Sequence, residues 1–479
     1  MAEMRNVKIS MLDDGDLQRI HDYSMKLLRE NGIQFHSERA VEIFKKHGFK
    51  VSGNQVYMTE QQVRVAIETA PSHFIIRGRD SKKSLNLGGG DFGVPGPIGP
   101  VYVTDIDNGQ RRGTLKDVEN LIKIYHASKV MTMNSNNGVE ANDVDINIRH
   151  LSVMRALLNN TDKPFYTKLF DYEQMHQAID MVEIAIGEKL KPGGNIYMSS
   201  GSCPSLSPLT WSAVCADAII ALSERGQVVT TGTATSTGIT GPVRLFGTLV
   251  VQNAELISGI VLSQLVNPGN PVGYGTAATS GNMRGAKYCC GSPTRLMLQV
   301  GSIEMGKRYY NLPSRALTYG TDSTCPDVQM GIESYENVIG PILSGGDYML
   351  SEIGTLDGLQ TTSYEKTIID EEITSRLFHI KRGIDVSEDA ASMDVILEIG
   401  SGGEYITSKD TLEHFGEEWY PSVSDWNANN KSRPDDDYSY LLRRANAEWK
   451  RRLAEAPDSL LDDAVSRELD RYIELQSKF

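Results

Sequence analysis

The chain has 479 residues, of which 40% are hydrophobic, and its formal net charge is -14. This composition allows a large buried core. The acidic charge argues against nucleic acid or an anionic membrane surface as a partner, because both attract basic stripes. The five cysteines form no CxxC pair, so we expect a reduced, cytoplasmic protein. The most apolar helical stretch, residues 247–266, contains Gln252, Asn253 and Glu255, which predicts a buried helix and not a membrane span.

The first part of the chain, residues 1–112, predicts an N-terminal α/β cap followed by a loop. Apolar periodicity and capping residues indicate helices at 17–31, 37–47 and 59–69, with short strands near Val51 and at 74–76. Residues 79–112 are rich in glycine and proline. A loop of this length inside a compact domain is more often functional than idle, so we expect it to approach the site.

From about Thr114 the chain alternates strand and helix. Strands are predicted at 130–133, 165–168, 196–199, 228–231, 272–275, 316–320 and 348–353. Helices are predicted at 115–127, 145–158, 172–186, 210–224, 245–266, 293–310 and 328–343. Parallel strands need such crossovers, and their unbroken repetition favours a (β/α)8 TIM-type barrel over residues 113–383. We expect the eighth strand within residues 92–105, at the PVYVTD tract (100–105) that precedes the helix at 115–127. Residues 384–479 predict a helical extension that packs on the barrel or on another subunit.

Metal and nucleotide sites have little support. The nine histidines lack the spacing of metal ligands, and neither an HExxH motif nor a structural zinc set is present. A zinc-dependent mechanism is therefore disfavoured, and we expect no bound metal. No glycine-rich loop stands between a strand and a helix in the way that phosphate binding requires.

Polar and aromatic residues gather at the predicted carboxyl ends of the strands, where barrel enzymes place their sites. Hydroxyls and tyrosines are frequent there, whereas groups suited to acid–base catalysis are few. Such a set suits a quaternary ammonium group, which aromatic faces and carboxylates can hold. The candidate substrate-binding residues are Phe92, Tyr166, Tyr274, Arg284, Tyr319, Asp322 and Glu352.

Several of these candidates have a structural alternative. Tyr274 and Tyr319 could simply fill the barrel interior. Asp322 follows its strand and is more consistent with capping a loop turn. For Glu352 the functional interpretation is favoured, because an inward-facing glutamate without a role would be costly to bury.

The roles of two arginines and one phenylalanine remain open. Arg284 and Arg295 could anchor a substrate carboxylate, although a surface position is favoured for each. Phe92, in the glycine-rich loop, could fold over the barrel mouth, although this is the less favoured alternative.

A series of short motifs carries a family resemblance. It comprises LPSRALTYGTDST at residues 312–324, Asp327-Val328-Gln329, Glu333 and SYEKTIIDEE at 363–372. The RRGT tract at 111–114 and Glu418-Trp419-Tyr420-Pro421 extend it over most of the chain. None of these motifs is specific alone. Their order resembles that of the trimethylamine methyltransferase family.

The resemblance implies transfer of a methyl group from a methylated amine to the cobalt of a corrinoid. That cobalamin is presented by a separate, cognate corrinoid protein, so no cofactor would be tightly bound by this chain. Founding members act on trimethylamine and carry pyrrolysine. This sequence has only the ordinary twenty residues, and we expect the corresponding position near residues 319–324. Members without pyrrolysine resemble quaternary-amine demethylases, which implies a small quaternary amine as substrate, with glycine betaine favoured and dimethylglycine as product.

Other functions stay open at this point. The same chemistry could act on proline betaine, carnitine or γ-butyrobetaine. A barrel hydrolase or lyase would need an acid–base pair, such as Asp322 with Glu352. A non-catalytic betaine-binding barrel is the third possibility. We expect a homo-oligomer with neither nucleic acid nor membrane as a partner.

Overall fold

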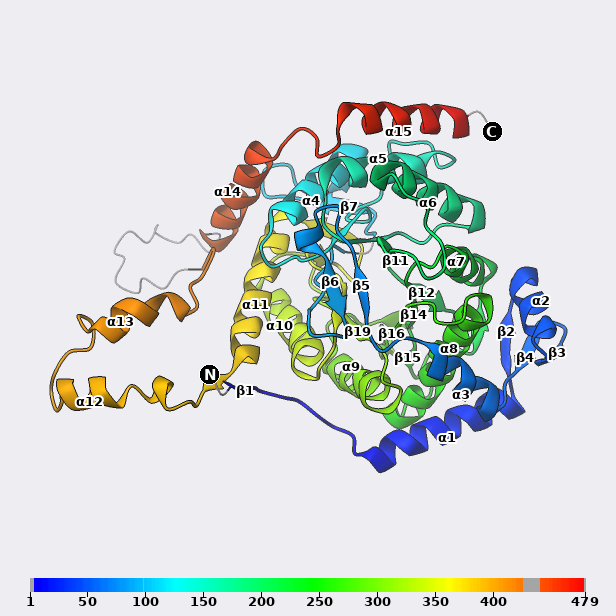
Figure 1. Cartoon of the computed structure of the whole chain (residues 1–479), viewed down its shortest axis with the longest axis horizontal. Helices are drawn as coiled ribbons and strands as arrows, with labels where there is room; N and C mark the ends of the chain where they lie inside the picture. The colour runs from blue at the N-terminus through cyan, green and yellow to red at the C-terminus, as the bar shows by residue number, and fades with distance from the viewer. Residues whose placement is uncertain (1–3, 98, 425–439, 478–479) are drawn as a thin grey trace.

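The computed structural model describes residues 4–97, 99–424 and 440–477. A barrel of parallel strands lies at its centre, with helices around it (Figure 1). One run of paired strands is β9 (Asn134–Ser135), β10 (Phe165–Thr167) and β11 (Met198–Ser200). The other is β12 (Cys203–Ser205), β14 (Val229–Thr233), β16 (Val272–Thr276), β19 (Ser314–Thr318) and β20 (Tyr348–Ser351). A parallel bridge between Ser199 and Val228 joins the two runs.

The glycine-rich segment closes the barrel. Gly93 pairs in parallel with Tyr348 of β20 and exchanges backbone hydrogen bonds of 2.9 Å with Asp347 and Met349. On its other side the Met133 N–H donates to the Val94 carbonyl at 3.1 Å. The eighth strand position therefore falls within the predicted region 92–105, and the (β/α)8 fold is confirmed. The strand lies at Gly93 and Val94, however, and the expectation that the PVYVTD tract forms it is wrong. The stretch that we grouped with the cap thus contributes a barrel strand.

The later part of that region lies outside the strand ring. Strand β7 (Tyr102–Thr104) pairs with β8 (Arg111–Arg112) and with β22 (Thr361–Ser363), and β21 (Thr355–Leu356) completes this small sheet. It joins the loop before the first barrel helix to the loop after β20.

Helices surround the strands in chain order. They are α4 (Leu115–Ala127), α5 (Arg149–Asn160), α6 (Tyr172–Ile186), α7 (Ala213–Glu224), α8 (Leu245–Val266), α9 (Pro293–Glu304), α10 (Val328–Leu343) and α11 (Tyr364–Arg382), and a π-helical turn, Met305–Tyr309, continues α9. Side-chain caps begin many of them, as Thr114 does for α4 and Ser363 for α11.

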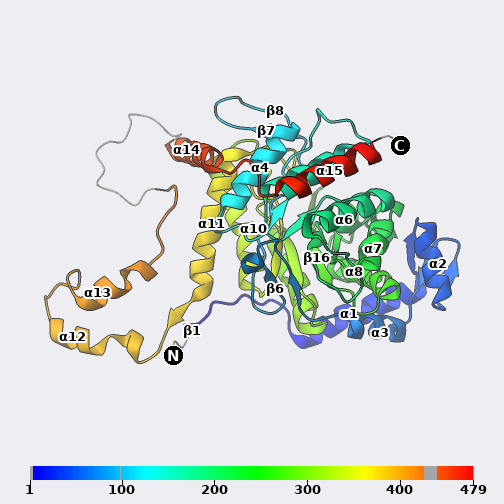
Figure 2. The same ribbon diagram turned by 45° about the horizontal axis from the view of Figure 1, so that its top comes forward.

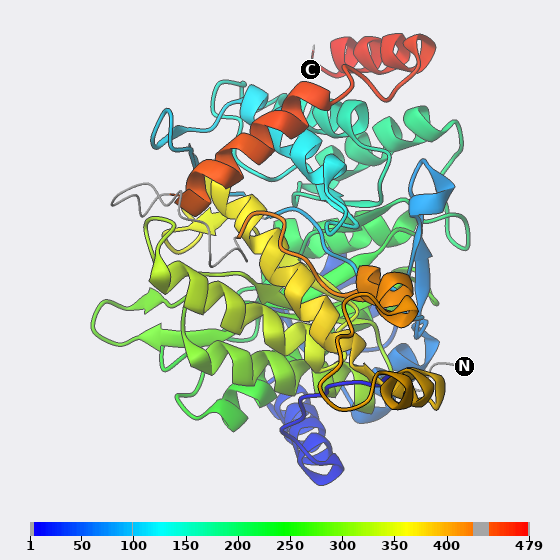
Figure 3. The same ribbon diagram turned by 90° about the vertical axis from the view of Figure 1, so that its left-hand side faces the viewer.

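The ring of helices is completed from the C-terminal end of the chain. Helix α14 (Tyr440–Glu455) packs against both α11 and α4 (Figure 3). Arg452 of α14 makes two hydrogen bonds, of 2.8 and 2.9 Å, to the Glu371 carboxylate of α11. Helix α15 (Asp463–Gln476) lies on α5 and α6. This half of the extension therefore packs on the barrel.

Helix α8 is the most apolar of the barrel helices. By length and composition it could cross a membrane, because its most apolar stretch has a mean hydropathy of 1.6. However, 72% of that stretch is buried inside the protein. It contacts β14 and β16 on one side and α1 (Asp14–Glu30) and α3 (Glu60–Thr69) on the other. The prediction of a buried barrel helix is confirmed.

The N-terminal residues cover the barrel from two directions. Helix α2 (Glu38–Lys46) joins α1 and α3 on the outside, with β2 (Ile33–Phe35), β3 (Lys50–Ser52), β4 (Gln55–Tyr57) and β13 (Thr210–Trp211) in one small sheet. The hairpin of β5 (Phe74–Ile76) and β6 (Leu85–Leu87) packs on Met133, Val228 and Tyr348, at the starts of barrel strands. The amino-terminal end of the barrel is thus plugged, which leaves the carboxyl ends for a site.

A C-terminal arm, which we define as residues 383–422, projects away from the barrel (Figures 1 and 2). It contains β23 (Ile384–Asp385), paired with β1 (Met4–Arg5), then α12 (Met393–Ile399) and α13 (Lys409–His414). Large apolar side chains are exposed on it, with Ile406 at 74% and Leu397 at 72% exposure.

Candidate functional site

A cavity of about 540 Å³ opens among the carboxyl ends of the barrel strands. This is the end at which barrel enzymes carry their sites. Its walls come from the ends of β10, β19 and β20 and from the loops that follow the strands. The side chains used below are Glu140, Tyr166, Lys168, Ser202, Tyr288, Leu317 and Glu352.

Glu352, one of the lining residues, belongs to a fully buried ion pair. Glu352 accepts a hydrogen bond of 2.8 Å from Arg295 Nη2 through Oε2, and both side chains are 0% exposed. Arg295 Nη1 also donates to the Cys290 carbonyl at 2.8 Å. Glu352 Oε1 has no hydrogen-bond partner among the described residues. The structure thus presents a carboxylate with one oxygen held by a guanidinium and the other uncommitted.

The protonation of Glu352 reflects two opposing effects. Burial raises the pKa of the Glu352 carboxyl, because the charged form loses hydration. The Arg295 guanidinium opposes this shift and stabilises the ionised form. The surface position that we favoured for Arg295 is wrong, since this side chain lies inside the protein.

Gly320 allows the ion pair to form. A Cβ atom at this position would lie less than 3.0 Å from Arg295 Nη1 and from Glu352 Oε2. Real side chains do not tolerate that approach. The Tyr319-Gly320 turn of the recognised motif therefore has a steric reason in the structure.

Two tyrosines contribute aromatic wall to the cavity. Tyr166 of β10 donates its hydroxyl hydrogen bond to the Gly96 carbonyl, and Tyr288 of β18 (Lys287–Tyr288) donates to the Ala277 carbonyl. Burial raises the pKa of both phenols, so they remain neutral at physiological pH. Tyr166 was predicted. Tyr288 was not predicted, because it lies in a hairpin that interrupts the alternation of strands and helices.

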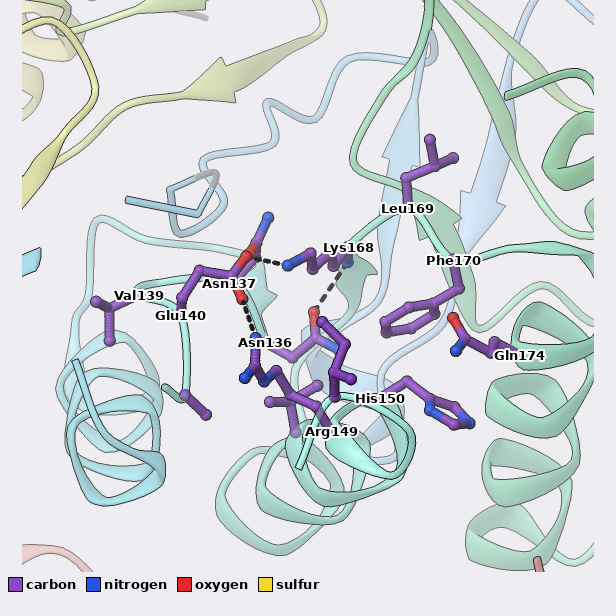
Figure 4. Close-up of a pocket in the computed structure, with 13 residues that line it drawn as sticks. Asn136, Asn137, Val139, Glu140, Arg149, His150, Lys168, Leu169, Phe170 and Gln174 are labelled. Carbon is purple, nitrogen blue, oxygen red and sulfur yellow. Dashed lines mark hydrogen bonds and ion pairs between the residues drawn. The ribbon is translucent and has the colours of Figure 1, made fainter. Parts of the chain in front are cut away.

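An ion pair separates the cavity from a smaller neighbouring pocket of about 140 Å³. Lys168 and Glu140 bond to each other and line both spaces, and Arg149 lies 3.7 Å from Glu140 (Figure 4). The pocket is further lined by Asn136, His150, Phe170 and Gln174. Lys168 is thus held by a carboxylate at the rim, which supports no covalent role for its amine.

Tyr274 and Tyr319 are not part of the cavity wall. The Tyr274 hydroxyl donates to Asn253 Oδ1 of α8 at 2.7 Å, and the Tyr319 hydroxyl shares a hydrogen bond with Thr374 of α11. Both rings therefore point outward into the barrel–helix interface. Successive side chains of a strand face opposite sides, so Gly273 and Gly275 face inward instead of Tyr274. This contradicts the expectation that Tyr274 and Tyr319 contact the substrate.

Phe92 lies at the opposite end of the barrel. Its ring packs against Phe378 at a centroid distance of 5.5 Å, and Lys381 lies over the ring at 4.8 Å. Because Gly93 pairs with the first residue of β20, its neighbour Phe92 belongs to the amino-terminal end. It does not fold over the mouth.

Arg284 and Asp322 are at the mouth but outside the cavity wall. Arg284 is exposed in the turn between β17 (Thr279–Asn282) and β18. The Asp322 carboxylate accepts the backbone N–H groups of Cys290 and Gly291 at 3.0 and 3.1 Å. It thereby holds the loop whose Cys290 carbonyl binds Arg295, so Asp322 supports the site without lining it.

Across the residues that the structure describes, no group of three or more His, Cys, Asp or Glu side chains is placed to hold a metal ion. The arrangement at the mouth can therefore bind and orient a small cation, with neutral phenols and one uncommitted carboxylate oxygen.

Comparison with known proteins identifies the family. Residues 2–478 match the family described as Trimethylamine methyltransferase (MTTB). The chain belongs to this family. It is therefore a methyltransferase, as the series of motifs indicated.

Characterised relatives cover almost the whole chain. The glycine betaine methyltransferase of Desulfitobacterium hafniense is 32% identical over 472 residues, 98% of each chain. The proline betaine:corrinoid methyltransferase of Eubacterium limosum is 32% identical over 476 residues, 97% of each chain. A trimethylamine methyltransferase of Methanosarcina barkeri is 29% identical and covers 86% of this chain and 84% of its own.

A solved structure supports the architecture. The monomethylamine methyltransferase of Methanosarcina barkeri superposes with a TM-score of 0.52 at 12% identity, over 93% of this chain and 95% of its own. The two proteins share the fold.

Proposed function

We propose that this methyltransferase transfers a methyl group from glycine betaine to the Co(I) corrinoid of a separate corrinoid protein and releases dimethylglycine. The observation that carries the proposal is the uncommitted Oε1 of Glu352 at a cavity lined by Tyr166 and Tyr288. A carboxylate and neutral aromatic rings are the groups that hold a trimethylammonium cation. Two full-length relatives named for betaines support the same substrate class.

The reaction needs little from the side chains. The acceptor Co(I) supplies the electron pair of the new carbon–cobalt bond. The broken C–N bond leaves its electron pair on nitrogen, so a neutral tertiary amine departs and no proton is transferred. The protein must orient the N–CH3 bond, exclude water and hold the cation. Neutral tyrosines and a paired glutamate at the cavity match that requirement.

Each part of the site has a distinct role in this proposal. Glu352 offers its free oxygen to the trimethylammonium group, while Arg295 and Gly320 hold the carboxylate in place. Tyr166 and Tyr288 flank the cation, and their hydroxyls donate hydrogen bonds to backbone carbonyls. The acceptor must approach from the mouth, because the hairpin of β5 and β6 plugs the other end.

The substrate assignment is tested by cobalt methylation with the cognate corrinoid protein. Glycine betaine should be turned over, whereas trimethylamine, dimethylamine and monomethylamine should give negligible methylation, since the chain has no pyrrolysine. Proline betaine, carnitine and γ-butyrobetaine complete the panel. Efficient demethylation of trimethylamine would refute the assignment.

We also propose that the enzyme is a homo-oligomer. The C-terminal arm exposes Leu397, Ile406 and Phe415 while projecting from the barrel. Exposed apolar groups on an extended segment are typical of a subunit contact. Light scattering on the purified chain should give a multiple of the 52.9 kDa monomer, and a Leu397→Asp, Ile406→Asp double variant should lower that mass. A monomeric wild type would refute this proposal.

A further inference from the structure

Arg315 is a buried guanidinium that the site as described leaves unused. It belongs to β19 and is 1% exposed. Leu317, two residues later on the same strand, lines the cavity. Residues two apart on a strand share a face, so Arg315 lies on the inward face one layer below the cavity.

Inward-facing glycines leave the space that Arg315 fills. A Cβ atom on Gly275 of β16 would lie 2.9 Å from Arg315 Nε, and one on Gly232 of β14 would lie 3.5 Å from Nη2. The same position on Gly232 would also collide with the Ser202 hydroxyl. Because Ser202 lines the cavity, the Nη2 end of the guanidinium lies close to the cavity floor.

The Arg315 guanidinium is without a hydrogen-bonded or charged partner in the described part of the chain. Within the described residues, Nε, Nη1 and Nη2 of Arg315 all lack a hydrogen-bond acceptor, and no carboxylate forms an ion pair with it. Its carbon Cζ lies 6.0 Å from the centre of the Tyr348 ring. The Tyr348 hydroxyl influences the pKa of Arg315 but is outside hydrogen-bond geometry, and it bonds Thr230 at 3.0 Å.

Such a charge is costly to bury. Desolvation lowers the pKa of Arg315. Arg295, the other fully buried arginine among the described residues, is by contrast paired with Glu352. An uncompensated guanidinium in a barrel interior is destabilising unless a ligand brings the opposite charge.

We propose that Arg315 binds the carboxylate of the substrate, which restricts the enzyme to zwitterionic betaines. The inference rests on the proposed function and adds a specificity-determining residue to it. A guanidinium fork matches a carboxylate in a bidentate arrangement. The carboxylate end then lies toward Arg315, and the trimethylammonium end lies above it, beside Glu352. This orientation directs a methyl group to the mouth, where the acceptor arrives.

Calorimetric binding to the full chain tests the proposal. Wild type should bind glycine betaine at least about 100-fold more tightly than glycine betaine amide, which keeps the shape and the cation but lacks the negative charge. Arg315→Met should weaken betaine binding by about 100-fold and leave the affinity for the amide and for tetramethylammonium within about 3-fold. Its melting temperature should not fall, because an uncompensated charge is removed.

A matched control separates charge from structure. Arg79 donates to the carbonyls of Leu158 and Thr161 at 2.6 and 2.7 Å and does not line the cavity. Arg79→Met should therefore lower the melting temperature and leave the preference for betaine over its amide unchanged.

Three results would overturn the proposal. They are equal wild-type affinity for betaine and its amide, unchanged betaine affinity in Arg315→Met, and an equal loss for all three ligands. The first comparison needs no variant, so it decides even if Arg315→Met does not fold. Betaine binding that depends on Arg315 but is not followed by cobalt methylation would refute the proposed function and support the carboxylate site. Rapid cobalt methylation from tetramethylammonium would refute the carboxylate site and leave the proposed methyl transfer standing.

Discussion

Replacing Glu352 by glutamine should weaken betaine binding and destabilise the fold by separable amounts. Removing one charge of a buried pair costs about 3–5 kcal/mol. Glutamine can still accept the hydrogen bond from Arg295 through its amide oxygen, and a hydrogen bond to a charged group contributes about 1.5–3 kcal/mol. We therefore expect the free energy of unfolding to fall by about 2 kcal/mol. The structural basis is the 2.8 Å contact between two side chains that are both 0% exposed.

The loss of binding follows from the free oxygen. Glu352 Oε1, which lacks a partner among the described residues, becomes part of a neutral amide. Loss of its attraction to a trimethylammonium group should cost about 1–2 kcal/mol, or about tenfold in Kd. Calorimetry gives the affinity and denaturant unfolding gives the stability. A neutral isostere with a tert-butyl group in place of trimethylammonium should bind wild type poorly and discriminate little between wild type and variant.

A second buried pair provides the matched control. Lys366 and Asp370 are also 0% exposed and 2.6 Å apart, and Asp370 Oδ1 is likewise without a partner in the described part of the chain. Asp370 does not line the cavity. Asp370→Asn should lower stability by a similar amount and leave the betaine affinity unchanged. Unchanged affinity in Glu352→Gln, or equal loss of affinity in both variants, would refute the assigned role of Glu352.

Gly320→Ala should lower both stability and betaine affinity, because the new Cβ would collide with the Arg295–Glu352 pair; a variant with wild-type melting and Kd would contradict this geometry. Tyr274→Phe should cost about 1–3 kcal/mol of stability because Asn253 Oδ1 loses its donor, and it should leave Kd unchanged; a weaker Kd would restore Tyr274 to the site. Betaine affinity should fall as the pH drops through the pKa of Glu352, because only the ionised carboxylate attracts the cation. The fall should begin above the ordinary pKa of 4.5, because burial raises the pKa of Glu352. Glu352→Gln should flatten this pH profile. Cobalt methylation should survive exhaustive chelation, since the sequence lacks metal-ligand spacing, and loss of activity restored by zinc would refute this.

The sequence by itself determined the architecture, because the evidence for it is local. Periodicity and capping predict seven of the eight barrel helices from their own residues, and helices α6, α8 and α10 begin and end where expected. Helix α11 was not predicted. The repeated alternation of strand and helix then leaves few folds to consider. Glu352 was chosen as a candidate for a similar reason, since a carboxylate at the end of an apolar strand is conspicuous in any register, and it does line the cavity.

Only the tertiary structure decided which side chains face the cavity. A parallel barrel strand is buried on both faces, so its sequence lacks the alternation that would reveal its inward side. Tyr166 and Tyr274 look equivalent in sequence, yet one lines the cavity and the other bonds to α8. The partners of Arg295 and the isolation of Arg315 likewise depend on neighbours that are distant in the chain. Burial and pairing are properties of the assembled barrel, and no single strand contains them.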